Sequence, residues 1–130
     1  MPPMGQAQAE IDINAAPDRV WAAIGDFGGL GNWMPGIESC ELQGEDRVLK
    51  MMGMEITERL YDRDESARSL TYGIVQGPFP LEKHRATITV TGEGDTSHVT
   101  WAVDVDDAMT DMMNKTYEGG LAALKAHAEG

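Results

Sequence analysis

Apolar and polar residues alternate along much of the chain, and a period of two predicts β-strands. The alternation is cleanest in residues 82–91 and 97–105. One side of the first segment carries His84, Ala86, Ile88 and Val90, and one side of the second carries Val99, Trp101, Val103 and Val105. Such strands have one buried and one solvated face, which is typical of an antiparallel sheet. Five further strands are predicted between turn-forming residues, at 6–13, 37–42, 47–52, 55–61 and 69–76.

Helical spacing occurs in three places. Pro17 with the apolar residues that follow it predicts a short helix over 17–24, and a second helical turn fits residues 27–33. Near the C-terminus, apolar residues recur in steps of three and four, which predicts a helix of about 20 residues that starts near Asp106 and Asp107. Its stripe consists of Met109, Met112, Met113, Thr116, Tyr117, Leu121 and Leu124.

The order of these elements predicts an α+β fold in a single domain over residues 1–130. Seven strands twist and curl strongly. One helix, only about 10 Å wide, cannot fill the hollow of such a sheet. The remaining space therefore holds either packed side chains or a cavity, and an apolar cavity with a few polar groups is the usual form of a small-molecule site.

Composition excludes several classes of function. Apolar residues make up 42% of the 130 residues, enough for a core, while 22 acidic against 10 basic residues give a net charge of −12. That charge argues against a nucleic-acid partner, which needs a basic face. No apolar run approaches roughly 18 residues, so we expect no stable membrane insertion. The N-terminus has no charged start and no apolar segment of a secretory signal, and we expect a cytoplasmic protein.

The chain offers little for a metal or another cofactor, and we predict none. Cys40 is the single cysteine, which excludes an intrachain disulfide and a cysteine zinc site, and we expect it to be inert packing. The histidines His84, His98 and His127 lack the spacing of metal ligands. Residues 28–31 contain three glycines but do not form a phosphate-binding GxGxxG loop.

Several stretches of the chain resemble the START-like, or SRPBCC, superfamily, and in particular its polyketide cyclase/dehydrase-like branch. The opening motif of that branch is similar to INAAPDRVWAAIGDFGGLGNWMPGI (Ile13–Ile37). Its middle and end are similar to ITERLYDRDESARSLTYGIVQGPFP (Ile56–Pro80), VTWAVDV (Val99–Val105) and YEGGLAALKAH (Tyr117–His127). The resemblance covers nearly the whole chain. It implies a helix-grip fold, in which a curved antiparallel sheet wraps around the long C-terminal helix and a hydrophobic pocket lies between them. The superfamily includes lipid carriers, hormone receptors and aromatic cyclases, so the resemblance implies no single activity.

We expect large apolar residues and methionines to line this pocket, because unbranched methionines suit a deformable wall for an apolar ligand. Core packing is the alternative for each of them. In the implied fold, Trp33 lies near the pocket entrance. The predicted ligand-binding residues are Trp33, Met34, Met51, Tyr72, Phe79, His84, Ile88, Trp101, Met109, Met113, Tyr117 and Leu121.

Three polar residues are candidates for acid–base chemistry in the pocket: His84, Tyr72 and Glu58. His84 shares its strand face with apolar residues, so it is either a structural histidine, a hydrogen-bond donor to a ligand, or a general base. Tyr72 is predicted to point inward, where its hydroxyl needs a ligand, a water molecule or Glu58 as partner. Alternation does not orient Glu58, which either enters the pocket or is solvated or paired with Arg59 or another base.

Three functions fit these features. The first is binding of a small hydrophobic or aromatic ligand, such as a lipid, a polyketide or an isoprenoid. The second is an enzyme, a polyketide aromatase/cyclase or dehydratase that uses His84, Tyr72 and Glu58. The third is an interaction module whose surface near residues 77–80 changes when ligand binds. The sequence leaves homodimer formation open.

Overall fold

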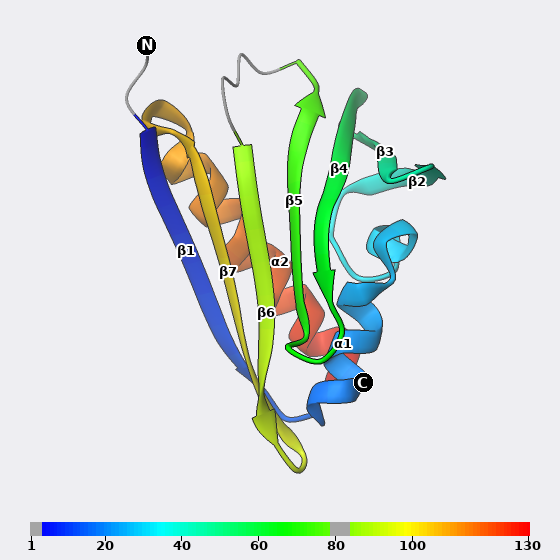
Figure 1. Cartoon of the computed structure of the whole chain (residues 1–130), viewed down its shortest axis with the longest axis vertical. Coiled ribbons are helices and arrows are strands. Elements are labelled where there is room, and N and C mark those ends of the chain that lie inside the picture. Colours follow the sequence, from blue (N-terminus) through cyan, green and yellow to red (C-terminus); the bar gives the residue numbers. More distant parts are fainter. Residues whose placement is uncertain (1–3, 79–83) are drawn as a thin grey trace.

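The computed structural model describes residues 4–78 and 84–130 as one curved, seven-stranded antiparallel sheet that holds a long helix on one face (Figure 1). The strand order across the sheet is β1-β7-β6-β5-β4-β3-β2. The strands are β1 (Met4–Ile13), β2 (Ile37–Gln43), β3 (Asp46–Met51), β4 (Met54–Asp64), β5 (Ser69–Gln76), β6 (His84–Glu93) and β7 (Thr96–Asp106). The helices are α1 (Pro17–Gly25), the short 3₁₀ helices η1 (Phe27–Asn32) and η2 (Asp107–Met109), and α2 (Thr110–Glu129).

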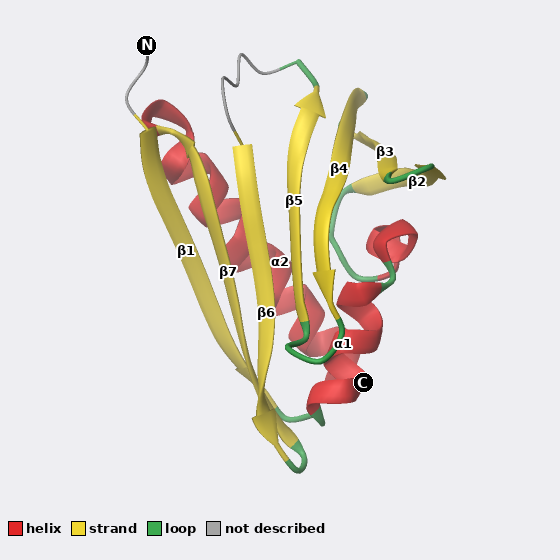
Figure 2. Ribbon diagram, in the orientation of Figure 1, coloured by secondary structure: helices red, strands yellow, loops and turns green. Residues whose placement is uncertain are grey.

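The α+β prediction is confirmed, and so is the helix-grip arrangement: α2 crosses the concave face of the sheet, and α1 with η1 covers one end (Figure 2). Each predicted strand and helix is present, with ends that differ by a few residues. The terminal helix begins at Thr110, because η2 occupies the three residues before it. Phe79 and Pro80, half of the segment 77–80, lie outside the described residues.

The core lies between α2 and the concave face of the sheet. The predicted inward residues of β6 and β7 are all buried, which confirms the alternation. Along α2 the buried positions are Met113, Tyr117, Gly120, Leu121, Leu124 and Ala128. Two predicted stripe residues, Met112 and Thr116, are exposed because α2 turns only one narrow face to the sheet.

Short helix α1 is held by both packing and polar contacts. Pro17 occupies its first turn, and Val20, Trp21 and Ile24 are buried. The indole N–H of Trp21 donates to the Glu65 carboxylate at 2.7 Å, which joins α1 to the β4–β5 connection. The guanidinium of Arg63 donates to the carbonyl of Gly25 at the end of the same helix.

Two irregularities interrupt the pairing of the central strands. β5 and β6 pair only from Ser69↔Thr89 to Tyr72↔Ala86, so that His84 and Ile74 lie beyond the last backbone pair. The register of β4 against β5 shifts twice, at Thr57/Glu58 and at Leu60/Asp62. Such bulges bend a strand and often lie beside functional sites.

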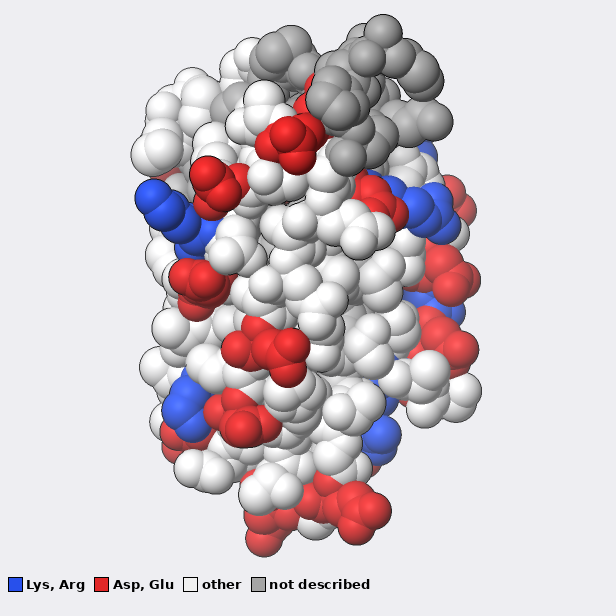
Figure 3. Space-filling view, turned by 90° about the vertical axis from the view of Figure 1, so that its left-hand side faces the viewer, with Lys and Arg blue, Asp and Glu red and all other residues white. Residues whose placement is uncertain are grey.

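The surface carries the acidic excess in a dispersed form. On the face seen in Figure 3, acidic side chains are scattered among uncharged ones, with few basic side chains between them. Within the described residues, no helix has the length and apolar character needed to cross a membrane.

Candidate functional site

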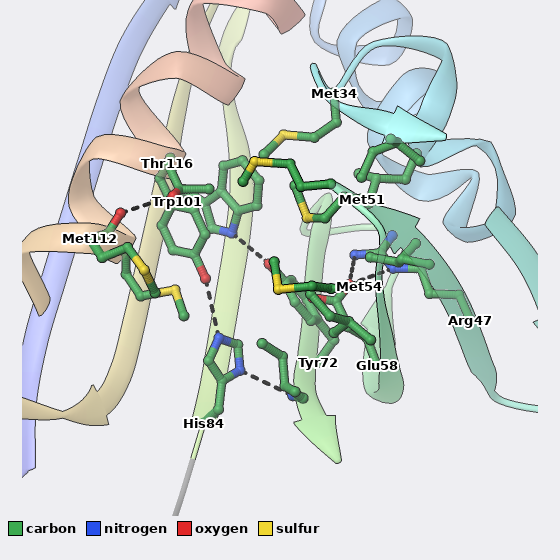
Figure 4. A pocket seen from close by; sticks show the side chains of 18 residues that line it. Met34, Arg47, Met51, Met54, Glu58, Tyr72, His84, Trp101, Met112 and Thr116 are labelled. Atoms are coloured by element: carbon green, nitrogen blue, oxygen red, sulfur yellow. Dashed lines mark hydrogen bonds and ion pairs between the residues drawn. The ribbon is translucent and has the colours of Figure 1, made fainter. Parts of the chain in front are cut away.

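A cavity of about 350 Å³ lies between the concave face of the sheet, η1 and the first half of α2 (Figure 4). Its size is within the range of small-molecule pockets. Most of the side chains around it are apolar. The lining residues are Leu30, Met34, Ile37, Arg47, Leu49, Met51, Met52, Met54, Ile56, Glu58, Tyr72, Ile74, His84, Trp101, Met112, Met113, Thr116 and Tyr117.

Methionines make up a third of this lining, and they come from opposite sides. Met34, Met51 and Met54 reach in from the η1 and β3–β4 side, whereas Met112 reaches in from α2 (Figure 4). Met52 is 77% exposed and Met112 is 40% exposed, so these two mark the open end of the cavity. A wall of unbranched thioether side chains can adjust to ligands of different shape.

The closed end contains a buried ion pair. Arg47 and Glu58 are 3% and 7% exposed, and both the Nε and the Nη2 of Arg47 lie 2.7 Å from Oε1 of Glu58. Arg47 also donates from Nη1 to the carbonyl of Phe27 at 3.1 Å, and its guanidinium lies 3.9 Å above the Phe27 ring. The protein itself therefore supplies this cation with a carboxylate, a carbonyl and an aromatic ring. Among the described residues, no hydrogen bond reaches Oε2 of Glu58.

Two tyrosines complete the polar end. The indole N–H of Trp101 donates to the Tyr72 hydroxyl at 3.1 Å. The Tyr117 ring stacks on Trp101 with 4.0 Å between the ring centroids and 4° between the planes, and its hydroxyl lies 3.4 Å from Nε2 of His84. β5, β7 and α2 are thus joined by aromatic side chains around one small region.

The protonation of His84 follows from its neighbours. The backbone N–H of Ile74 donates to Nδ1 of His84 at 3.1 Å, so Nδ1 carries no proton. Burial lowers the pKa of His84, which keeps the ring neutral near pH 7. The single ring proton is therefore on Nε2, where it points to the Tyr117 oxygen.

Both tyrosines remain protonated. Burial raises the pKa of Tyr72, and the Glu58 carboxylate raises it further. Burial likewise raises the pKa of Tyr117, with a further contribution from the neighbouring Tyr72.

The donors and acceptors can now be counted. The indole N–H of Trp101 can only donate a hydrogen bond, and the same is true of the protonated Nε2 of neutral His84. Each tyrosine oxygen is therefore the acceptor in its contact. The Tyr117 hydroxyl shares a hydrogen bond with the Tyr72 side chain, which lowers the pKa of Tyr72 and raises that of Tyr117, so Tyr117 is its donor. Only the Tyr72 phenol therefore keeps its proton for another acceptor. The cavity offers this one phenol proton and one carboxylate oxygen, Oε2 of Glu58, in an otherwise apolar space. Such a site is suited to a ligand with an apolar body and an oxygen that accepts hydrogen bonds.

Seven of the twelve predicted ligand-binding residues line this cavity: Met34, Met51, Tyr72, His84, Trp101, Met113 and Tyr117. All three predicted acid–base residues, Glu58, Tyr72 and His84, also line it. Ile88 and Leu121 belong to the close-packed core, and Met109 packs against that core at the start of α2. Trp33 is buried behind Trp101 instead of standing at the entrance. Phe79 is outside the described residues.

Two expectations about partners need correction. Glu58 is paired with a base, as one alternative had it, but the base is Arg47 and the pair is buried, so the solvated alternative is wrong. The Tyr72 hydroxyl bonds to Trp101, which was not among its expected partners. Arg47 itself was missed, although it shares strand parity with the inward-facing Leu49 and Met51.

The described residues contain no group of three or more His, Cys, Asp and Glu side chains that is placed to hold a metal ion. Cys40 is half-buried, and desolvation raises the pKa of its thiol, which disfavours the nucleophilic thiolate.

Comparison with known proteins agrees with this architecture. Residues 4–129 match the family described as polyketide cyclase / dehydrase and lipid transport. No functionally curated protein matches the sequence.

Solved structures of the same fold come from several sources. The protein XoxI from Bacillus cereus is 32% identical, with a TM-score of 0.88 over 94% of each chain. A START superfamily protein from Mycobacterium smegmatis is 17% identical, with a TM-score of 0.75 over 96% of this chain and 94% of the other. The di-domain aromatase/cyclase BexL of the BE-7585A biosynthetic pathway is 18% identical, with a TM-score of 0.82 over 96% of this chain and 46% of BexL. At these identities the last two show a shared fold.

Proposed function

The chain belongs to the polyketide cyclase / dehydrase and lipid transport family, and we propose that it binds a small hydrophobic ligand that carries a carbonyl or similar acceptor oxygen. The observation that carries this proposal is the phenol proton of Tyr72, left without a committed acceptor at the closed end of an apolar cavity. A buried donor without an acceptor costs free energy, which a ligand oxygen recovers.

The apolar body of the ligand lies against the methionines and aliphatic residues nearer the opening. Because Arg47 and Glu58 neutralise each other, the cavity favours a neutral ligand over an ion. Aromatic polyketides, isoprenoid ketones and similar lipids have this combination of properties.

A matched pair of probes tests this binding mode. 2-Acetylnaphthalene and 2-ethylnaphthalene have nearly the same shape and differ in one carbonyl oxygen. We expect the ketone to bind several-fold more tightly, in line with one neutral hydrogen bond, as measured by quenching of tryptophan fluorescence or by calorimetry. Tyr72→Phe should reduce that preference, whereas Tyr61→Phe, on an exposed tyrosine outside the cavity, should leave it intact. Equal affinity for both probes in the native protein would overturn the proposal.

A specific feature also favours a second function, catalysis of enolisation. Arg47 donates its hydrogen bond to Oε1 of Glu58, which leaves Oε2 to act as a base in the cavity. In such a step Oε2 takes a proton from the carbon next to a carbonyl, the C–H electron pair moves into the C–C bond, and the carbonyl oxygen gains negative charge. The phenol proton of Tyr72 then stabilises that oxygen.

Deuterium exchange separates the two functions. An enolising enzyme incorporates deuterium from D₂O into the methyl group of 2-acetylnaphthalene faster than buffer does, and Glu58→Gln abolishes the excess rate. Binding of the ketone without any such exchange would leave the protein as a carrier or receptor.

A further inference from the structure

A chain of hydrogen bonds leaves β5 at Ile74 and returns to the same strand at Tyr72. The Ile74 N–H donates to Nδ1 of His84 at 3.1 Å, and Nε2 of His84 lies 3.4 Å from the Tyr117 oxygen (Figure 4). The Tyr117 hydroxyl shares the next hydrogen bond with the Tyr72 side chain. The chain therefore passes through β6 and α2 before it reaches the Tyr72 hydroxyl.

Every bond of this chain runs in one direction. A backbone N–H can only donate, so the ring proton of neutral His84 is on Nε2 and is donated to Tyr117. Tyr117 has a single hydroxyl proton, which it donates to the Tyr72 oxygen. The backbone of the sheet thus determines which of the two phenols is the donor in the bond between them.

The Tyr72 oxygen receives two hydrogen bonds from the protein. The indole N–H of Trp101 donates to it at 3.1 Å, in addition to the Tyr117 hydroxyl. A hydroxyl oxygen has two lone pairs for accepting, so Tyr72 can act toward a ligand only as a donor. Hydrogen bonds that a hydroxyl accepts in a buried site polarise it and strengthen the bond that it donates.

We propose that His84 and Tyr117 are positioning residues, which hold the Tyr72 proton toward the cavity and so make the pocket select an acceptor oxygen. This inference rests on the ligand-binding function proposed above and specifies the origin of its selectivity. Both residues act through Tyr72. Without the His84 donor, the bond between the two phenols can run either way, and in one of these arrangements the Tyr117 oxygen takes the Tyr72 proton.

The ratio of the dissociation constants of 2-ethylnaphthalene and 2-acetylnaphthalene measures this selectivity. His84→Asn keeps an amide oxygen for the Ile74 N–H but has no atom in the place of Nε2, so Tyr117 loses its donor. If the two arrangements of the phenols are then equally populated, the ketone binds about twofold more weakly, while 2-ethylnaphthalene binds as before. A merely structural role of His84 would weaken both probes alike and leave the ratio unchanged.

Tyr117→Phe provides the second arm of the test. It removes the link between His84 and Tyr72 but keeps the ring that stacks on Trp101. Tyr72 then has no neighbouring phenol to take its proton, so we expect His84→Asn to have no effect on the ratio in this background. Such non-additivity is the signature of residues that act through one network. His98→Asn, on a surface histidine outside the cavity lining, should leave the ratio at its native value.

The infrared stretching band of the bound carbonyl gives an independent readout, because a stronger donated hydrogen bond lowers its frequency. We expect a higher frequency in His84→Asn and also in Tyr117→Phe, where Tyr72 accepts one hydrogen bond fewer. Unchanged affinity for 2-ethylnaphthalene shows that each variant is folded.

The outcomes separate this inference from the function on which it rests. If the native protein prefers the ketone but both variants keep the native ratio and carbonyl frequency, the positioning role is overturned and the binding function stands. An equal effect of His84→Asn with and without Tyr117 also overturns it. If the native protein has no preference for the ketone, the proposed function is overturned and this inference with it.

Discussion

The imidazole Nδ1 of His84 accepts a hydrogen bond from the backbone N–H of Ile74 at 3.1 Å, just beyond the point where β5 and β6 stop pairing. A side chain thus satisfies a backbone donor that the sheet leaves open. The same contact fixes the ring proton on Nε2, facing Tyr117. His84 therefore both bridges the gap between β5 and β6 and orients a cavity residue, and its protonation would disturb both roles.

The stability of the fold should decrease on acidification because of His84. Burial lowers its pKa below the ordinary 6.5, so the folded state binds fewer protons than the unfolded state just below pH 6.5. The stabilisation is complete above pH 6.5 and is lost as the pH falls toward the folded pKa. We expect melting temperatures between pH 7.5 and 5 to fall less steeply in His84→Asn, because its amide oxygen can accept the Ile74 N–H without titrating.

His98 provides the control for this experiment. The hydrogen bonds that it donates to the carboxylates of Asp12 and Glu10 raise its pKa, so its contribution has the opposite sign: it is present at low pH and is lost as the pH rises through the folded pKa. The ring is on the surface, where solvent screens the effect. His98→Asn should leave the acid-side loss in place, and a loss that disappears in His98→Asn instead of His84→Asn would contradict the assignment.

Breaking the buried ion pair should be costly. Arg47→Met leaves Glu58 charged, buried and unpartnered, and removes the donor to the Phe27 carbonyl. We expect a loss of about 3–5 kcal/mol in the free energy of unfolding, measured in urea. The double variant Arg47→Met with Glu58→Leu should recover much of it, because replacing both charges by apolar groups is often close to neutral.

The neighbouring pair Arg59–Asp46 is a matched control on the same two strands. Arg59 also uses two nitrogens, at 2.8 and 3.1 Å from the two oxygens of Asp46, but on the solvated face. Arg59→Met should therefore have a much smaller effect. Equal losses in Arg47→Met and Arg59→Met would mean that burial of the inner pair does not matter.

Two adjacent glycines of α2 should respond in opposite directions to alanine. A Cβ on Gly119 meets nothing within 4 Å, so Gly119→Ala should stabilise the helix by about 1 kcal/mol. A Cβ on Gly120 would lie 2.7 Å from Sδ of Met34 and 3.0 Å from the Trp101 ring. The flexible Met34 can move, but Trp101 is held by Tyr72 and Tyr117.

We therefore expect Gly120→Ala to destabilise the protein, since overpacking costs about 1–3 kcal/mol and outweighs the gain in helix propensity. It should also push Met34 into the cavity and weaken ligand binding. In urea unfolding, Gly119→Ala should have a higher free energy of unfolding than the native protein, and Gly120→Ala a lower one. A stabilised Gly120→Ala would show that the contact between α2 and Met34 is loose.

The fold could be predicted from the sequence largely because alternation marks each strand separately. The register of one hairpin could also have been predicted from the sequence. Met51 pairs with Met54 around a two-residue turn, and in an antiparallel pair the residue numbers of partners have a constant sum, so Arg47 must face Glu58. The ion pair was missed because alternation alone does not tell which face of β4 is buried.

The contacts between α2 and the sheet could not be predicted from residue numbers in this way. Whether Tyr117 lies over Trp101 or Ile88 depends on where the helix crosses the sheet, and that position results from the packing of many side chains. For the same reason the predicted apolar stripe of the helix contained both Met112 and Leu121, and the sequence did not show that Met112 lies at the cavity mouth and Leu121 in the core.

At the turn beside the cavity mouth, we infer that the residue present favours ligand binding at the expense of local stability. Met52 and Gly53 connect β3 to β4 as a two-residue hairpin loop with φ values of +52° and +75°. Asparagine is strongly favoured over an unbranched apolar residue at such a position, because it tolerates the left-handed conformation. Met52 is also 77% exposed, so its side chain gains little from burial in the empty protein.

We therefore expect Met52→Asn to raise the free energy of unfolding by about 1 kcal/mol, measured in urea, and at the same time to weaken binding of apolar probes such as 2-acetylnaphthalene. The binding loss follows because the variant removes a thioether from the open end of the cavity. Glu45→Asn is the control, since it changes another exposed hairpin loop, between β2 and β3, away from the cavity lining. If Met52→Asn binds the probes as tightly as the native protein does, the exposed methionine has no role in ligand binding.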